Sequence, residues 1–154
     1  MIKSTIVIPN FNGMQYIQTC LESLYGGTTK EIAVIVVDNA STDGSMELVR
    51  DRFPQVKLIT NQTNTGFSHA VNQGIRLSTT PYVILLNNDT QVDLSFVHEL
   101  EKVMDNDRRK RLFSASAKLI SLYDKEVMDD AGDYYCALGW AFARGKGKSA
   151  AYYN

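Results

Sequence analysis

Residues 32–39 read Ile32-Ala33-Val34-Ile35-Val36-Val37-Asp38-Asn39, an apolar run that stops abruptly at a polar turn. Two further segments have the same form, Thr5-Ile6-Val7-Ile8-Pro9-Asn10 and Tyr82-Val83-Ile84-Leu85-Leu86-Asn87-Asn88-Asp89. Unbroken runs of β-branched residues and leucine are typical of parallel strands that are buried on both faces. Open α/β sheets bind ligands just beyond the carboxyl ends of their strands, so these polar turns are the candidate site.

Segments of helical period separate these runs along the chain. We expect strands near 5–9, 32–38, 56–60 and 82–86, and helices near 14–25, 44–53, 67–77 and 94–105. Asp43 and Asp93 are placed to cap two of the helices. The alternation predicts an α/β fold with a Rossmann-like, mainly parallel sheet flanked by helices. After Asp105 the pattern weakens, and we expect one strand near 112–120 and hairpins or loops at 139–148.

Composition narrows the class of protein. The chain has 154 residues, of which 44% are hydrophobic and 21% charged, and its net charge is −1. These values describe an ordinary globular domain and argue against nucleic acid as a partner, which needs a dense basic surface. No stretch approaches the roughly 20 apolar residues of a membrane span, and we expect a cytoplasmic protein. Cys20 and Cys136 lack a CxxC pairing and are expected to be reduced structural thiols.

The polar turns carry the candidate chemistry. The turn after the first strand lacks both GxGxxG and a Walker A loop, which disfavours dinucleotide and P-loop folds. Asp38 has two interpretations: its carboxylate accepts the imide N–H of a uracil or thymine base, or it only ends the strand and stabilises the turn. Asp89 also has two, since a carboxylate flanked by amides suits a hard divalent cation that carries phosphate oxygens, but also a simple Asx turn.

Several motifs taken together resemble one enzyme family. The chain contains Ile8-Pro9-Asn10-Phe11-Asn12-Gly13, Val36-Val37-Asp38-Asn39-Ala40-Ser41-Thr42-Asp43-Gly44-Ser45, Asn64-Thr65-Gly66-Phe67 with Asn72 and Gly74, and Leu85-Leu86-Asn87-Asn88-Asp89-Thr90. Their order and spacing resemble the inverting family-two nucleotide-sugar glycosyltransferases from about Ile2 to Lys118. The resemblance implies a GT-A fold, with a Rossmann-like half for the nucleotide followed by a less regular half for the acceptor.

The resemblance also implies roles for individual residues. The turn after the first strand would lie against the nucleotide, Asp38 would receive the base, and Asn88 would approach the ribose or the metal's water shell. Asp89 would be the metal ligand, for Mg²⁺ or Mn²⁺. The donor-nucleotide residues expected in this way are Pro9, Asn10, Asn12, Asp38, Asn64, Gly66 and Asn88.

Two features depart from the family pattern. The metal motif keeps a single carboxylate, so we expect weak intrinsic affinity and a cation that binds together with the sugar nucleotide. The sequence stops at Asn154, before the region where the family carries its acidic general base, so we expect that base outside this chain. We therefore expect a donor-binding part at 1–120 and an incomplete start of the acceptor side at 121–154.

The predicted function is metal-assisted transfer of a sugar, with inversion, from a UDP- or dTDP-linked donor to a glycan or lipid-linked acceptor. Bacterial cell-wall or polysaccharide assembly is the expected setting, and the motifs resemble the rhamnosyltransferase branch. The alternative is a non-catalytic nucleotide-sugar-binding module or an inactive fragment that lacks the base. The basic run Arg108-Arg109-Lys110-Arg111 is either a solvated loop or a contact with the inner face of a membrane, and self-association as a homo-oligomer is a further hypothesis.

Overall fold

The structure, a computed structural model, describes residues 1–29, 31–136 and 141–153. The chain divides into two units, Met1–Glu101 and Lys102–Asn154, and each is described by itself. The candidate site lies entirely in the first unit, so the fold of that unit comes first. No helix in the described part of the chain combines the length and the apolar character needed to cross a bilayer.

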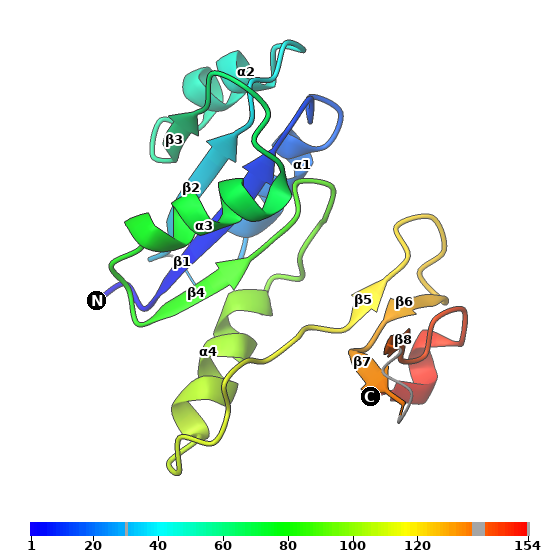
Figure 1. Cartoon of the computed structure of the whole chain (residues 1–154). Helices are drawn as coiled ribbons and strands as arrows, with labels where there is room; N and C mark the ends of the chain where they lie inside the picture. The colour runs from blue at the N-terminus through cyan, green and yellow to red at the C-terminus, as the bar shows by residue number, and fades with distance from the viewer. Residues whose placement is uncertain (30, 137–140, 154) are drawn as a thin grey trace. The chain divides into compact units, whose positions relative to one another are not determined.

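The first unit is built on a four-stranded parallel sheet in the order β3-β2-β1-β4 (Figure 1). The strands are β1 (Ser4–Asn10), β2 (Ala33–Asp38), β3 (Lys57–Thr60) and β4 (Tyr82–Leu85). They alternate with the helices α1 (Ile17–Tyr25), α2 (Ser45–Arg52), α3 (Phe67–Leu77) and α4 (Phe96–Asn106). This confirms the α/β class, the parallel sheet and the position of each expected strand and helix up to α4.

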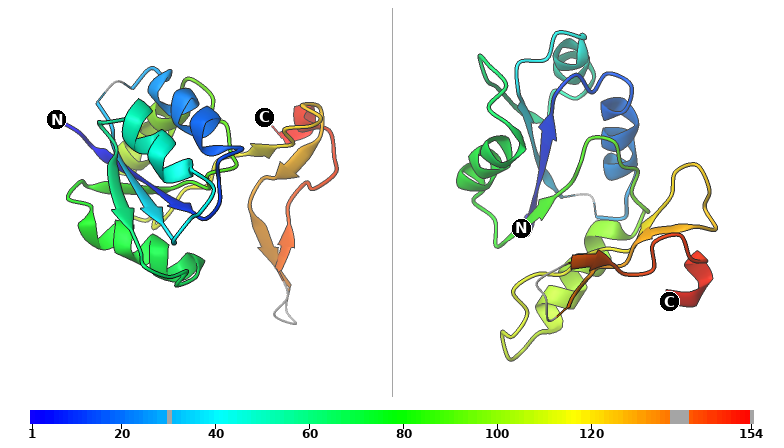
Figure 2. Two further views of the ribbon diagram at one scale, coloured as in Figure 1. Left: turned by 90° about the horizontal axis from the view of Figure 1, so that it is seen from above. Right: turned by 45° about the vertical axis from the view of Figure 1, so that its right-hand side comes forward.

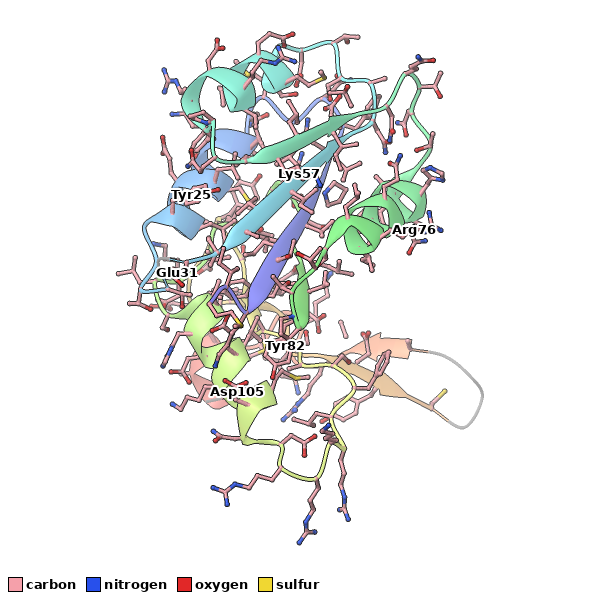
Figure 3. The ribbon with its side chains drawn as sticks, turned by 90° about the vertical axis from the view of Figure 1, so that its left-hand side faces the viewer. Tyr25, Glu31, Lys57, Arg76, Tyr82 and Asp105 are labelled. Atoms are coloured by element: carbon pink, nitrogen blue, oxygen red, sulfur yellow. The ribbon has the colours of Figure 1, made fainter. Side chains whose placement is uncertain are left out.

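Helices cover both faces of the sheet. Alternate side chains of the central strands, Ile6 and Ile8 among them, pack with residues of α1, α2 and α4 in one core. The intervening positions Ile35 and Val37 pack with Ala70 of α3 in a second, smaller core. Figure 2 (right) shows α3 on one side of the strands and α1 and α2 on the other. In Figure 3 the labelled Tyr25 of α1 and Arg76 of α3 lie on opposite sides of the sheet.

The order of the strands determines where a ligand fits. The chain passes from β1 through β2 to β3, then returns so that β4 pairs with the other side of β1. The direction of strand order therefore reverses between β1 and β4. In open α/β sheets this reversal leaves a crevice at the carboxyl ends of the strands, which is the usual ligand site.

Two expectations about the strands and helices need correction. The expectation that the run 82–86 is buried on both faces is wrong, because β4 is the end strand of this sheet and Val83 and Leu85 are 37% and 52% exposed. The helix expected from residue 14 begins at Ile17, after a turn in which the carbonyl of Gly13 accepts hydrogen bonds from the backbone N–H groups of Tyr16 and Ile17.

The second unit contains short antiparallel pairs and one 3-10 turn. Strand β5 (Leu119–Ile120) pairs with β6 (Met128–Asp130), β7 (Asp133–Tyr135) pairs with β8 (Ala141–Ala143), and η1 spans Ala150–Tyr153.

The strand expected at 112–120 is wrong over most of its length. Only Leu119 and Ile120 are paired, and Phe113, without a neighbouring strand, is 99% exposed. In the segment 139–148, β8 and the turns after it agree with the expected hairpin, and Gly139 and Trp140 lie outside the described residues. The division into a donor part at 1–120 and an acceptor part at 121–154 stays a prediction.

Candidate nucleotide-sugar site

A cavity of about 380 Å³ opens where β1 and β4 end. This volume lies within the usual range for small-molecule sites. Its wall comes from the ends of β1, β2 and β4, the turn before α3, and the first residue of α3. The lining residues are Pro9, Asn10, Phe11, Asn39, Asn64, Gly66, Phe67, Asn87, Asn88 and Asp89.

The cavity gathers most of the residues that the sequence singled out. Among the predicted donor and metal residues, those that line it are Pro9, Asn10, Asn64, Gly66, Asn88 and Asp89. Asn12 and Asp38 are outside the lining. Their placement is now known, while the role of each residue toward a ligand stays a prediction.

Asp38 lies behind the cavity wall and is 0% exposed. Its carboxylate accepts hydrogen bonds from Asn10 Nδ2 at 2.8 Å, from the backbone N–H of Ser41 at 2.9 Å and from Ser41 Oγ at 2.5 Å. These contacts hold the turn after β2 against the end of β1. A base N–H could therefore reach this carboxylate only by exchanging with one of these partners.

Asn12 joins the loop after β1 to the loop after β2. Its side-chain oxygen accepts a hydrogen bond from the backbone N–H of Thr42 at 2.9 Å, and its own backbone N–H donates to Ser41 Oγ at 2.8 Å. Its φ of 50° lies in the left-handed region, which asparagine tolerates better than most residues. Asn12 thus fixes the shape of the loop that carries Pro9 and Phe11.

Asp43 makes a second link between the same loops. Its carboxylate accepts hydrogen bonds from the backbone N–H of Met14 at 2.8 Å and from the backbone and side chain of Ser45 at 3.0 and 2.6 Å. Burial raises the pKa of Asp43, but the hydrogen bonds from Ser45 and Met14 outweigh it and leave the pKa below its usual value. Asp43 was predicted to cap α2, but the cap position is Gly44, so Asp43 stands one residue before the observed cap.

The wall beside α3 depends on a glycine and a set of amides. Gly66 has φ 84° and ψ 164°, a combination that only glycine adopts readily. Its N–H donates to Asn64 Oδ1 at 2.9 Å, and its carbonyl accepts from the buried Asn39 Nδ2 at 3.2 Å. Asn61 Nδ2 donates in turn to Asn39 Oδ1 at 2.9 Å. This network ties the turn before α3 to the end of β2.

Sequence reasoning missed four lining residues: Phe11, Asn39, Phe67 and Asn87. Each is adjacent in sequence to a residue that was predicted, so the extent of the polar turns was a usable signal. The two phenylalanines are both exposed. They give the cavity apolar surface that the polar motifs alone did not indicate.

The candidate metal ligand, Asp89, lies in the turn that follows β4. Asp89 is exposed and lines the cavity. The backbone carbonyl of Asn87, two residues before Asp89, accepts hydrogen bonds from Thr90 Oγ1 at 2.6 Å and from Cys20 Sγ at 3.7 Å. These bonds stabilise the turn after β4. Burial raises the pKa of the Cys20 thiol to about 11, so this group stays protonated at neutral pH. Cys20 and Cys136 form no disulfide with each other.

The sequence matches the family described as "Glycosyl transferase family 2" over residues 5–112. The chain belongs to this family. This confirms the resemblance drawn from the motifs, and the match covers α1 to α4 and all of the parallel sheet except Ser4.

Curated relatives and solved structures agree with the family. The chain is 34% identical over 93 residues to the uncharacterized glycosyltransferase YibD of Escherichia coli (strain K12), covering 58% of this chain and 27% of YibD. It is 31% identical over 112 residues to the teichoic acid poly(glycerol phosphate) polymerase of Staphylococcus epidermidis, covering 70% of this chain and 16% of the polymerase. The chain thus spans less than a third of the length of these relatives.

Two solved structures share the fold. S. aureus TarS 1-349 in complex with UDP-GlcNAc has a TM-score of 0.63 at 23% identity, covering 68% of this chain and 31% of TarS. The mannosyltransferase PcManGT from Pyrobaculum calidifontis, in complex with GDP-Man and Mn²⁺, has a TM-score of 0.62 at 25% identity, covering 68% and 33%. These similarities confirm the expected GT-A-like architecture.

The residues that follow β4 fit a hard divalent cation that is held together with a phosphate-bearing ligand. The exposed Asp89 offers one carboxylate, and Asn88 offers a side-chain oxygen that has no hydrogen-bond partner among the described residues. The described residues contain no cluster of three or more metal-ligating His, Cys, Asp or Glu side chains. Mg²⁺ and Mn²⁺ bind well to few protein oxygens when phosphate oxygens complete their coordination.

Proposed function

We propose that this family 2 glycosyltransferase transfers a sugar from a UDP- or dTDP-linked donor to a glycan or lipid-linked acceptor, with inversion at the anomeric carbon and with the assistance of Mg²⁺ or Mn²⁺. The observation that carries the proposal is a single cavity, at the β1–β4 reversal, that combines an exposed carboxylate with amides and two aromatic rings. Such a combination suits a ligand with a diphosphate and flat or ring-shaped ends.

Different parts of the cavity suit different parts of the donor. Asp89 is the proposed metal ligand and so marks the end for the diphosphate. Phe11 and Phe67 supply exposed aromatic surface on which a base or a sugar ring can pack. Asn64 and Gly66 offer backbone and amide groups beside that surface.

The proposed preference for a pyrimidine nucleobase depends on Asp38 and is the most specific part of the proposal. A carboxylate behind Asn10 favours a pyrimidine imide N–H as its new partner, provided that the Ser41 hydroxyl gives way. Among the structural neighbours, TarS was solved with UDP-GlcNAc and PcManGT with GDP-Man. A comparison of uridine, thymidine and guanosine diphosphates therefore tests this part directly.

The proposed reaction is a single in-line displacement. The acceptor oxygen forms a bond to the anomeric carbon while the bond from that carbon to the diphosphate oxygen breaks, and a general base takes the acceptor proton. A bound divalent cation supplies stabilisation of the charge on the leaving diphosphate. We assign the holding of that cation to Asp89, and we assign no residue of this chain as the base.

The setting of the reaction is also a proposal. We infer a role in bacterial cell-surface glycan assembly, at the inner face of the membrane. The basic run Arg108–Arg111 is exposed throughout and would favour an anionic lipid surface. The exposed Val83 and Leu85 on β4 support self-association. Flotation with anionic vesicles tests membrane contact, and light scattering at high concentration tests self-association.

The experiment for the central proposal is a transfer and hydrolysis assay. The chain is incubated with Mn²⁺ and a panel of UDP- and dTDP-linked sugars, including dTDP-rhamnose, and the product's anomeric configuration is read by NMR. We expect release of the nucleoside diphosphate with an inverted sugar product, and loss of both with Asp89→Asn. Retention of configuration would overturn the mechanism, whereas binding without any turnover would identify a nucleotide-sugar-binding module instead.

A further inference from the structure

Asn10 lines the cavity, and both ends of its side-chain amide are hydrogen-bonded. The residue is 3% exposed. Its Nδ2 lies 2.8 Å from Asp38 Oδ1, 3.0 Å from Ser45 Oγ and 3.2 Å from Ser41 Oγ. Its Oδ1 accepts a hydrogen bond from Asn88 Nδ2 at 2.7 Å. One amide therefore joins the ends of β1, β2 and β4.

The carboxylate of Asp38 determines which way the two amides face. A carboxylate has no proton to donate, so the side of Asn10 that meets it must be the N–H₂ group. The side-chain oxygen of Asn10 then faces Asn88, which must donate a hydrogen bond to it from its own N–H₂ group. This leaves the side-chain oxygen of Asn88 as an unused acceptor among the described residues, on a residue that lines the cavity together with Asp89.

Gly13 makes this arrangement possible. A Cβ atom at residue 13 would overlap both Asn10 Oδ1 and Asn88 Nδ2, the two atoms of the hydrogen bond. The backbone of Gly13 is outside the left-handed region, so its conformation alone does not require glycine. Space for the Asn10–Asn88 hydrogen bond is the reason that the structure gives for a glycine at this position.

We propose that Asn10 and Gly13 are positioning residues. They fix where the side chain of Asn88 lies and which end of its amide, the oxygen or the N–H₂ group, is left to bind a ligand together with Asp89. The hydrogen bonds from the Asp38 carboxylate through the Asn10 amide to Asn88 form a relay. This relay leaves oxygen acceptors available to a divalent cation and its diphosphate. This inference rests on the proposed function for its ligand. It predicts that loss of the Asn10–Asn88 hydrogen bond reduces the gain in diphosphate affinity that the metal provides. Contacts to the nucleoside stay unchanged.

The test measures UDP and uridine binding by calorimetry, with and without Mn²⁺, for the wild type, Gly13→Ala, Asn88→Ala and the double variant. We expect Gly13→Ala to reduce the Mn²⁺-dependent gain in UDP affinity about tenfold, as loss of one buried hydrogen bond predicts, with uridine affinity unchanged. Asn88→Ala should give a similar reduction, and the double variant should be no worse than either single one.

The matched control is Gly27→Ala. Gly27 is also a buried glycine, and a Cβ there would lie 3.1 Å from the carbonyl oxygens of Leu24 and Leu94, away from the cavity lining. It should alter the unfolding midpoint and leave the Mn²⁺-dependent gain unchanged. Full retention of that gain in Gly13→Ala, or additive losses in the double variant, would overturn the proposal.

The proposed function can fail separately from this inference. If the wild type shows no Mn²⁺-dependent UDP binding, the function is wrong, and the hydrogen bond is then judged by urea unfolding of the same four proteins. Non-additive shifts of the unfolding midpoint for Gly13→Ala and Asn88→Ala would support the Asn10–Asn88 relay, and additive shifts would refute it. This second measurement also serves if Gly13→Ala folds poorly, because Asn88→Ala removes the same bond without adding volume.

Discussion

Replacing Asp38 tests whether its buried carboxylate organises the site. The group is 0% exposed and accepts three hydrogen bonds, from Asn10 Nδ2 and from the backbone and hydroxyl of Ser41. In Asp38→Ala the Asn10 amide keeps Ser45 Oγ at 3.0 Å, but the Ser41 N–H loses the one partner it has among the described residues. A donor left without a partner and shielded from water costs about 1–3 kcal/mol, and Asp38→Ala removes three hydrogen bonds, so we expect the free energy of unfolding to fall by about 3 kcal/mol.

The Asp38→Asn variant separates charge from shape. Asparagine keeps one acceptor oxygen but turns an N–H₂ group toward a donor, so we expect a smaller loss of about 2 kcal/mol. Both losses are a large part of the 5–15 kcal/mol by which domains are usually stable.

Urea unfolding followed by far-ultraviolet circular dichroism measures these losses. With a slope of about 2 kcal/mol per molar, a loss of 3 kcal/mol lowers the midpoint by about 1.5 M. The control is Asp51→Ala on the exposed surface of α2, which should stay within about 0.5 kcal/mol of the wild type. The reasoning is refuted if Asp38→Ala is no more destabilising than Asp51→Ala.

Three further predictions follow from the packing and the titrating groups. Alanine at a helical glycine usually stabilises, but a Cβ on Gly74 would overlap the side chain of Val7, so Gly74→Ala should destabilise by about 1–3 kcal/mol in the same urea assay. Adding Val7→Ala should recover part of that loss beyond additivity, and an additive double variant would contradict the contact. Cys20, buried with a pKa of about 11, should react with a maleimide at neutral pH only as fast as the protein unfolds, and rapid labelling of the native state at Cys20 would argue against its burial. Although burial raises the pKa of Asp43, its hydrogen bonds lower the value overall, so the stability it adds is present at neutral pH and is lost as the pH falls below about 4. Urea midpoints from pH 7 to pH 3 should therefore fall less steeply for Asp43→Asn, and parallel curves would count against this role.

The sequence predicted the sheet well because the information was local. The apolar runs at 5–10, 32–39 and 82–89 have the β-branched composition and length of parallel strands, and the helical segments between them impose parallel pairing. The exposure of Val83 and Leu85 could not be predicted in the same way. It depends on β4 lying at the end of the sheet, which is a property of strand order and not of the run itself.

The sequence predicted the location of the cavity but not the hydrogen bonds around it. The rule that ligands bind beyond the carboxyl ends of strands was enough to predict that Asn10, Asn88 and Asp89 lie at one cavity. The burial of Asp38 was not foreseeable, because the donors that surround it come from β1 and from the following loop. Spacing along the chain does not show which donors the fold will bring to a carboxylate.

The most direct measurement of the central claim is UDP affinity with and without Mn²⁺, for the wild type and for Asp89→Asn. If the cavity holds a nucleoside diphosphate and a cation together, Mn²⁺ strengthens UDP binding to the wild type, and Asp89→Asn removes that gain while metal-free affinity stays the same. If Mn²⁺ strengthens binding equally in both proteins, Asp89 is not the metal ligand. If UDP binds neither protein, the cavity is not a nucleotide site and the account is wrong.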